Sequence, residues 1–296
     1  MGIKTNKTRV QYLDIMTEEI KSNKIPLYNK LSALLMTDDL RVWRSDSSVY
    51  NDFAVNREEI NELIDLACDM SLYYSEFEEE YWIPVHAWRI LCELDLGEAV
   101  EPLISMFDEY PEDDYCEYLD IELPEVVARL SKGSHLKILS DLLYDKSKSI
   151  DTRILALRTI ELSGRYFDFC TSECLDILAH CLDNSDHEQR DFNGFIIAAM
   201  LHLDKPESKI ESIRKAFNND IVDLGIVGDL EDVEIGLGLR DKRETPEPNY
   251  RLEKYPQLDL LNKDTRQLPT KKSWVEMIYA HVVLERNIRN AALMML

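Results

Sequence analysis

Short apolar stripes with helical spacing alternate with polar stretches along this chain. Between residues 83 and 109 the apolar side chains recur every three or four positions, first over 85–94 and, after Gly97, over 99–107. This spacing predicts two amphipathic helices. Because neither helix can bury its apolar side by itself, the pair is expected to form an antiparallel hairpin that packs against a neighbouring hairpin.

The same pattern returns three times further along the chain. The further pairs of stripes lie at 123–143, 150–181 and 192–217. Gly97 and Gly133, which separate the two helices of the first and second pairs, are 36 residues apart. The third pair departs from the pattern by an aromatic insertion between its helices, with Tyr166, Phe167 and Phe169. A period of this length is typical of stacked helical repeats.

The first of these pairs also carries a family resemblance. The stretch His86-Ala87-Trp88-Arg89-Ile90-Leu91-Cys92-Glu93-Leu94-Asp95-Leu96-Gly97-Glu98-Ala99-Val100-Glu101-Pro102-Leu103 resembles a HEAT-like repeat of the short bacterial type. The helix entry with Asp151, Arg153, Ala156 and Leu157 is similar to that of a HEAT unit. The resemblance implies an all-α fold, an α-solenoid (superhelix) of HEAT-like helical hairpins. It implies no single activity, because the family includes scaffolds, transport receptors, lyases and DNA-repair enzymes.

Elements outside the repeats complete a five-part organisation. Asn56 and Glu59 have the spacing of a capping box that opens a helix before the repeats, and Ser273 and Glu276 repeat this spacing near the C-terminus. Four of the ten prolines lie between residues 241 and 272. The predicted parts are an N-terminal helical cap (1–80), HEAT-like repeats in about four pairs (81–220), an irregular C-terminal cap (221–240), an extended Pro-containing strap (241–272) and an amphipathic C-terminal helix (273–296).

Negative charge is concentrated in one third of the chain. The formal net charge is −23, and residues 51–145 hold 25 acidic and 5 basic side chains, a net −20. Residues 1–50 carry a net +2 (8 basic, 6 acidic), and residues 146–296 a net −5 (21 basic, 26 acidic). A field of this sign repels nucleic acid and anionic membrane surfaces and steers a basic partner inward. Acidic surface also has a general use, which is to keep a protein soluble.

The densest acidic tract runs from Asp108 to Glu122 with tyrosines interleaved. Carboxylate and tyrosine side chains together suit an arginine-rich partner. Part of the tract has a structural reading, since Asp120, Glu122 and Glu125 stand where the next helix is expected to begin and would favour its dipole. The candidate partner-binding residues are Glu78, Glu79, Glu80, Asp108, Glu109, Tyr110, Glu112, Asp113, Asp114, Tyr115, Glu117 and Tyr118.

The sequence offers little support for a catalytic or cofactor-binding motif. The sequence contains no GxSxG, P-loop or HExxH motif, and Gly236 and Gly238 lack the third glycine of a dinucleotide site. Cys170, Cys174 and Cys181 are the best metal candidates, but their spacing places Cys174 and Cys181 on one apolar helix face, which favours a role in the core. No catalytic residue, cofactor or metal site is predicted.

Histidines offer two weaker candidates. His202 and Asp204, with the distant His281, imitate a facial iron triad, but the two histidines belong to separate helical elements. His86 adjoins the apolar stripe of the first pair and is interpreted as a structural histidine. Neither set predicts an active site.

Together these patterns favour a non-catalytic protein–protein interaction scaffold or adaptor that binds a basic protein or peptide. Two alternatives stay open: an acidic nucleic-acid mimic that inhibits a DNA-binding protein, and a HEAT-like lyase or other enzyme with a site in its concave groove. Direct nucleic-acid binding and membrane insertion are not expected, and the N-terminus lacks an apolar signal segment, which favours the cytoplasm. The helix at 273–296 is expected to fold back, to self-associate or to engage the partner.

Overall fold

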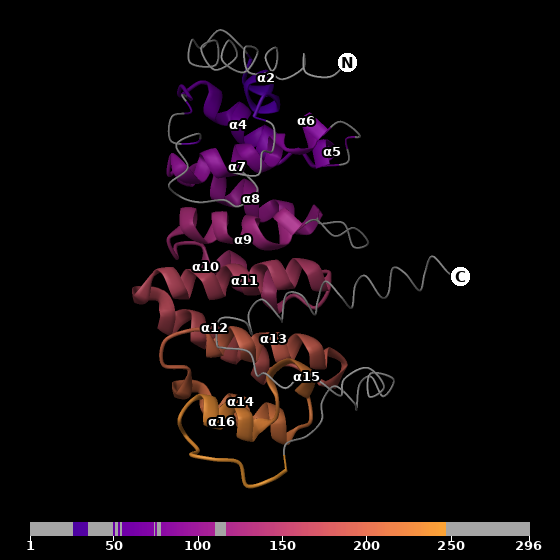
Figure 1. Cartoon of the computed structure of the whole chain (residues 1–296), viewed down its shortest axis with the longest axis vertical. Coiled ribbons are helices and arrows are strands. Elements are labelled where there is room, and N and C mark those ends of the chain that lie inside the picture. The colour runs from indigo at the N-terminus through magenta and orange to yellow at the C-terminus, as the bar shows by residue number, and fades with distance from the viewer. Residues whose placement is uncertain are drawn as a thin grey trace, which may run out of the picture. The chain divides into compact units, whose positions relative to one another are not determined.

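The computed structural model describes residues 26–34, 50, 53, 55–73, 75, 78–109 and 117–246. In these ranges the secondary structure is helical throughout, without a strand, so the all-α prediction is confirmed (Figure 1). The chain divides into two compact units, one of Met1–Tyr110 with Cys116–His135 and one of Pro111–Tyr115 with Leu136–Leu296. Among the residues placed by the structure, no helix has the length and apolar content needed to span a membrane.

Unit 1 consists of short helices around a core centred on α7. Its elements are α2 (Leu27–Ser32), α4 (Glu59–Ala67), α5 (Met70–Tyr73), α6 (Glu78–Tyr81), α7 (Ile83–Glu93), η1 (Gly97–Ala99), α8 (Val100–Ser105), η2 (Met106–Glu109) and α9 (Glu117–Ser131). Helix α7 contacts α2, α4, α5, α6 and α9. Every residue from Ile83 to Leu91 is buried, because α7 has neighbours on all its sides.

Local sequence signals explain where several helices of unit 1 begin and end. The Asn56 side chain accepts hydrogen bonds from the backbone N–H groups of Glu58 (2.9 Å) and Glu59 (3.1 Å), and the Glu59 carboxylate accepts one from the Asn56 N–H group (2.9 Å). The predicted capping box is therefore confirmed. Gly97 lies in the break between α7 and α8, as the pattern predicts.

The start of α9 differs from the prediction. The helix begins at Glu117 rather than near Leu123, and Pro124 lies inside it. Glu122 and Glu125 are thus well within the helix, so the prediction that they favour the dipole at its N-terminus is wrong. Glu122 is buried, with only 8 % of its surface exposed, and it pairs with a cation of α7.

Unit 2 contains the remaining described helices. They are α10 (Leu136–Tyr144), α11 (Ile150–Tyr166), η3 (Asp168–Cys170), α12 (Thr171–Asp183), η4 (His187–Gln189), α13 (Arg190–Leu201), η5 (Pro206–Lys209), α14 (Ile210–Asn218), α15 (Leu224–Val227) and α16 (Leu230–Gly236). Helix α11 contacts α10, α12 and α13, while α12 contacts α10, α13 and α14. Each of α10, α11 and α12 therefore meets the next helix in sequence and the helix after next.

Two close approaches fix the packing of unit 2. Gly164 of α11 leaves no space for a Cβ atom, which would lie 2.8 Å from the Leu203 side chain and 3.1 Å from the Cβ of Cys174. Gly194 of α13 is similarly close to Ile226 of α15. The absence of a side chain at these two positions lets the helices approach each other.

The cysteines of α12 belong to the core, as the sequence predicts. Cys174 and Cys181 lie on the buried face of α12 together with Leu178. The Cys170 thiol donates to the carbonyl oxygens of Ser163 (3.4 Å) and Phe167 (3.2 Å). Within the described ranges no three His, Cys, Asp or Glu side chains are grouped closely enough to hold a metal ion.

Candidate functional site

The strongest candidate site is a group of carboxylates at one end of unit 1. Helices α4 and α7 pack side by side and are joined through α5 and α6, so the C-terminus of α4 lies at the N-terminal end of α7 (Figure 1). The antiparallel α8 and the following η2 end on the same side. Asp65 and Glu109 both act on the Cys68 thiol, and Asp69 and Glu80 both act on the Tyr28 hydroxyl. We call these four carboxylates, with Asp108 beside Glu109 in η2, the acidic end.

Helix polarity adds to the negative potential of the acidic end. Asp65 lies in the last turn of α4, where the backbone carbonyl groups already carry partial negative charge, and no basic side chain lies in that turn. Asp108 and Glu109 lie in η2, which continues α8 at its C-terminus, and both side chains are exposed. Acidic groups at helix C-termini are unfavourable for the helix itself, because they add to the negative end of its dipole.

The pKa values of titratable side chains next to the acidic end are shifted. Burial, together with the carboxylates of Glu109 and Asp65, raises the pKa of the Cys68 thiol to about 12. The hydroxyl of Tyr28 donates a 2.6 Å hydrogen bond to Glu80, and this bond, with burial, raises the pKa of Tyr28 to about 12. Glu80 also accepts a 2.5 Å hydrogen bond from Ser75, and the two bonds lower the pKa of its carboxyl. Glu80 is therefore held as a carboxylate.

Four aromatic rings of unit 1, between α5 and α7, pack against one another. Tyr73 stacks on Trp88 with ring centroids 6.0 Å apart, Tyr81 meets Tyr73 edge-on at 5.9 Å, and Trp82 meets Tyr81 edge-on at 4.8 Å. These four rings form what we call the aromatic layer. Trp88 is fully buried, whereas Tyr81 and Trp82 are half-buried. Tyr81, which directly follows Glu80 in sequence, is thus partly accessible to solvent.

A buried polar network supports the helix that carries this layer. Arg89 of α7 donates two hydrogen bonds to the Glu122 carboxylate, from Nε (2.7 Å) and Nη2 (2.6 Å), and a third from Nη1 to the Tyr50 hydroxyl (3.0 Å). The Tyr50 hydroxyl lies 2.8 Å from His86 Nδ1. Because the Tyr50 oxygen accepts from Arg89, its proton is available to His86 Nδ1, and the neutral imidazole then carries its proton on Nε2.

His86 is structural, in agreement with the sequence interpretation. The side chain is fully buried, and burial together with the Arg89 charge lowers its pKa to about 3. The neutral ring therefore accepts the hydroxyl proton of Tyr50 and helps to orient the Arg89–Glu122 pair. An imidazole that stays neutral over the physiological range cannot act as a proton switch there.

The structure places only part of the predicted partner-binding set. The side chains of Glu80, Asp108 and Glu109 are described, and all three lie at the acidic end. Tyr110, Glu112, Asp113, Asp114 and Tyr115 lie outside the described residues, as do the side chains of Glu78, Glu79, Glu117 and Tyr118. The backbones of residues 78, 79 and 117 belong to α6 and the first turn of α9.

Sequence reasoning missed several members of the site. Asp65 and Asp69 come from α4 and the segment after it, and Tyr28 and Ser75 reach Glu80 from separate segments. No tract of acidic sequence marks these positions. The available signal was the placement of Asp65 in the last turn of a predicted helix, where a basic residue is usual.

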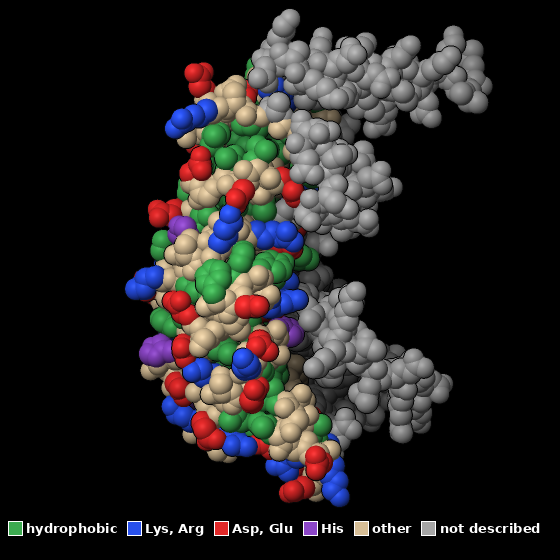
Figure 2. Space-filling view, turned by 90° about the vertical axis from the view of Figure 1, so that its left-hand side faces the viewer, with side chains coloured by type: hydrophobic (Ala, Val, Ile, Leu, Met, Phe, Trp, Pro, Cys, Tyr) green, Lys and Arg blue, Asp and Glu red, His purple; other side chains and the backbone are tan. Residues whose placement is uncertain are grey.

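Surface charge outside the acidic end is largely balanced in pairs. Lys132 binds Asp95 (2.6 Å), Lys146 binds Asp186 (2.8 Å), and Lys215 binds Asp183 (3.0 Å). The face drawn in Figure 2 accordingly carries basic side chains beside acidic ones. Such exposed pairs contribute little stability.

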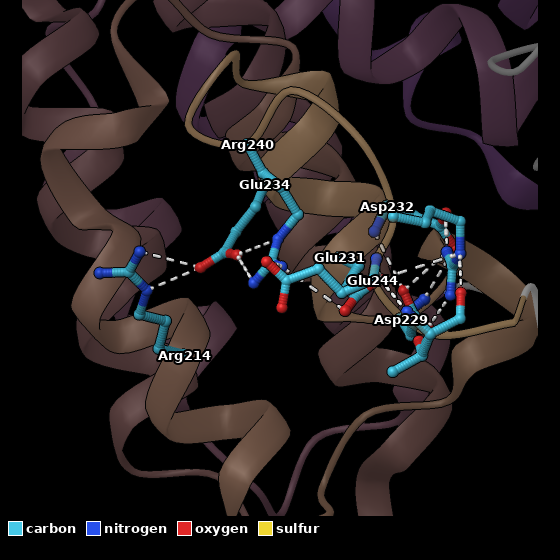
Figure 3. Close-up of polar contacts among 9 residues, drawn as sticks. Arg214, Asp229, Glu231, Asp232, Glu234, Arg240 and Glu244 are labelled. Atoms are coloured by element: carbon cyan, nitrogen blue, oxygen red, sulfur yellow. Dashed lines mark hydrogen bonds and ion pairs between the residues drawn. The ribbon is translucent and has the colours of Figure 1, made fainter.

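A second polar cluster lies at the C-terminal end of the described part of unit 2 (Figure 3). Glu234 accepts hydrogen bonds from Arg214 Nε (2.9 Å) and Arg240 Nε (3.0 Å), while Arg243 binds Asp229 and Asp232. The Glu231 carboxylate accepts the backbone N–H groups of Glu244 (2.9 Å) and Thr245 (3.2 Å). We call this cluster the C-terminal clamp, because it holds residues 240–245 against α16.

Removal of Arg243 is expected to open the clamp. In Arg243→Ala the Asp229 and Asp232 carboxylates lose their guanidinium, which weakens the hold on the neighbouring backbone. Amide hydrogen exchange over residues 237–246, measured by mass spectrometry, should become about tenfold faster. Lys242→Ala is the control, because Lys242 is an exposed neighbour outside the clamp, and it should leave the exchange unchanged. Equal exchange in wild type and Arg243→Ala would contradict this prediction.

Comparison with known proteins identifies no relative: no family model, no curated protein and no solved structure matches the chain.

Proposed function

We propose that this protein is a non-catalytic interaction scaffold, an α-solenoid of HEAT-like helical hairpins, that binds a basic protein or peptide through the acidic end of unit 1. Support for the repeats comes from the helix positions, since α7/α8, α11/α12 and α13/α14 lie where the stripes predict them. In unit 2 the contacts of α11 with α13 and of α12 with α14 are those expected of stacked hairpins.

One observation carries the binding part of the proposal. Of the five basic residues between 51 and 145, four are already in ion pairs away from the acidic end. Arg89, Arg129, Lys132 and Lys137 bind Glu122, Glu125, Asp95 and Asp141. The fifth, Arg57, precedes α4 and so lies at the opposite end of that helix from Asp65. The acidic end therefore lies in a segment in which 25 acidic side chains stand against 5 basic ones, and this excess of negative charge is the support for a basic partner.

The aromatic layer favours arginine over lysine in the partner. A guanidinium is planar, donates in a fork to a carboxylate and stacks on aromatic faces, whereas an ammonium is a compact, strongly hydrated charge. The chain's own arginines behave in this way, since Arg89 makes a bidentate pair with Glu122 and Arg153 lies 4.3 Å from the Phe192 ring centroid. We therefore expect an arginine-rich segment to bind more tightly than a lysine-rich one of equal charge.

The test is charge reversal at the acidic end with a matched control. Fluorescence anisotropy would measure the binding of a short oligo-arginine peptide to wild type, to Asp108→Lys/Glu109→Lys and to Glu98→Lys/Glu101→Lys. The two variants change the net charge equally, but Glu98 and Glu101 are exposed near the opposite end of the same helical pair. Reversal at the acidic end should weaken binding about tenfold at low salt, and less at high salt.

The control variant distinguishes binding at a defined site from general electrostatic attraction to the protein. Wild-type affinity in Glu98→Lys/Glu101→Lys, beside the loss in Asp108→Lys/Glu109→Lys, supports the acidic end as the binding surface. Equal weakening in both variants would mean that the peptide responds only to net charge, and the proposed site would be wrong. An oligo-lysine peptide of the same length tests the preference for arginine.

A further inference from the structure

Unit 2 exposes aromatic side chains in the turn between α11 and α12. Phe169 is 75 % exposed and Tyr166 is 38 % exposed, and Phe167 lies between them in sequence. The Phe167 ring centroid is 6.4 Å from that of Tyr166 and 6.0 Å from that of Phe169. We call these three residues the aromatic corner; they are the insertion that interrupts the third predicted helix pair.

The backbone holds the aromatic corner in place. The Phe167 N–H group donates to the Ser163 carbonyl (3.0 Å) and closes α11, while the Thr171 hydroxyl donates to the Gly164 carbonyl (2.7 Å). The buried Cys170 anchors η3 between them. The exposed rings are therefore presented by a fixed turn, so a bound segment would not have to order this turn.

The chain itself contains a suitable occupant. After Pro246, the last residue that the structure describes, 26 residues lead to the segment 273–296, in which 16 of 24 residues are apolar or aromatic. A segment of this composition is expected to bury its apolar side chains. The clamp at Arg243 fixes the point from which this length of chain leaves unit 2.

Chain length favours this occupant over a second copy. Twenty-six residues extend to roughly 85 Å, which exceeds the diameter of roughly 35–40 Å expected for a unit of this size. As a flexible chain their ends lie about 30 Å apart on average. A segment tethered at this range has an effective concentration of order millimolar, well above the micromolar concentration of a second copy.

We propose that residues 273–296 dock on the aromatic corner of the same chain. This inference does not depend on the acidic end of unit 1, and either can hold without the other. The docked segment covers Phe169 and Tyr166 with its apolar side chains and thereby removes their rings from solvent.

Photo-crosslinking in the full chain tests the contact directly. With p-benzoylphenylalanine in place of Phe169, irradiation should link position 169 to residues 273–296 in a product of monomer mass, identified by mass spectrometry. The same photo-crosslinker at Ile150 is the control, because Ile150 is 46 % exposed at the other end of α11. Links to a second copy, or links only to residues outside 273–296, would overturn the proposal.

A second measurement follows the segment without a crosslinker. Trypsin cleavage after Arg286 and Arg289 should be slow while the segment is docked and about tenfold faster in Phe169→Ser, because opening exposes it. Ile150→Ser should cleave at the wild-type rate. Phe169 is exposed and its turn is held by backbone contacts, so the substitution leaves the fold intact, which circular dichroism verifies. Equal cleavage in wild type and Phe169→Ser would contradict docking at this corner.

Discussion

Replacing Arg89 by methionine is expected to lower the free energy of unfolding of unit 1 by about 3–5 kcal/mol. The guanidinium is fully buried and is the bidentate partner of Glu122. Without it, the Glu122 carboxylate has to stay buried with no countercharge or to take up a proton. Burial already raises the pKa of Glu122 despite the two hydrogen bonds from Arg89, so the pair offsets a cost of desolvation.

The double variant distinguishes this mechanism from a loss of packing. In Arg89→Met/Glu122→Met both charges are gone, and most of the lost stability should return, because an apolar pair of similar volume needs no desolvation of charge. If removal of the arginine's packing were the cause, the double variant would be at least as unstable as the single one. Tyr50 would lose its hydrogen bond from Arg89 in both variants, so that contribution is common to both.

Tryptophan fluorescence measures this effect in unit 1. Trp43, Trp82 and Trp88 all belong to unit 1, and only Trp274 belongs to unit 2. In a Trp274→Phe background the tryptophan fluorescence therefore comes from unit 1 alone. Urea unfolding of wild type, Arg89→Met and the double variant in this background gives the midpoints and slopes. A single midpoint shared by wild type and Arg89→Met would show that the pair has no role in stability.

Replacing Glu161 by leucine is expected to cost unit 2 a similar amount, about 3–5 kcal/mol. Glu161 of α11 is buried and accepts a 2.9 Å hydrogen bond from His202 Nδ1, with Arg165 at 3.3 Å and Arg158 at 3.6 Å. A leucine would leave the largely buried Arg158 guanidinium without this carboxylate. Glu161→Gln keeps an acceptor for His202 and should lose less.

The pH dependence of this contribution has a definite sign. Burial raises the pKa of Glu161, but the hydrogen bond from His202 and the charges of Arg158 and Arg165 outweigh burial, so the pKa lies below its ordinary value of 4.5. The ionised carboxylate therefore stabilises unit 2 above about pH 4.5, and this stabilisation is lost as the pH falls through the lower pKa of the folded state. Glu161→Gln should lack this loss.

Hydrogen exchange measured by mass spectrometry over residues 150–201 tests both statements. The free energy of opening of α11 and α13 should be lower in Glu161→Leu than in wild type at neutral pH. In wild type it should fall as the pH drops below about 4.5, and in Glu161→Gln it should fall less. Parallel acid profiles for wild type and Glu161→Gln would rule out Glu161 as the group responsible.

The spacing of apolar residues was sufficient to predict most helices. The stripes around Gly97 and Gly133, the capping box at Asn56 and the buried face of Cys174 and Cys181 all depend on neighbours within one or two helical turns. Local periodicity and capping are encoded over such short distances, so they can be read from the chain without its fold. The predicted start of α9 was wrong, because the acidic residues before Leu123 give no apolar stripe and the helix continues through Pro124.

Tertiary structure decided which charges are buried in pairs and which are exposed. Glu122 was expected at the start of a helix, where it would favour the dipole, but α9 turns it toward Arg89, 33 residues earlier in the chain. Asp65 and Asp69 lie near Glu109 and Glu80 only because α4 packs against α7, and α7 and α8 both pack against α9. The sequence by itself determined the helical elements and the excess of negative charge, since both follow from local composition. The choice between a buried pair and an exposed carboxylate depends on long-range packing, which only the folded chain establishes.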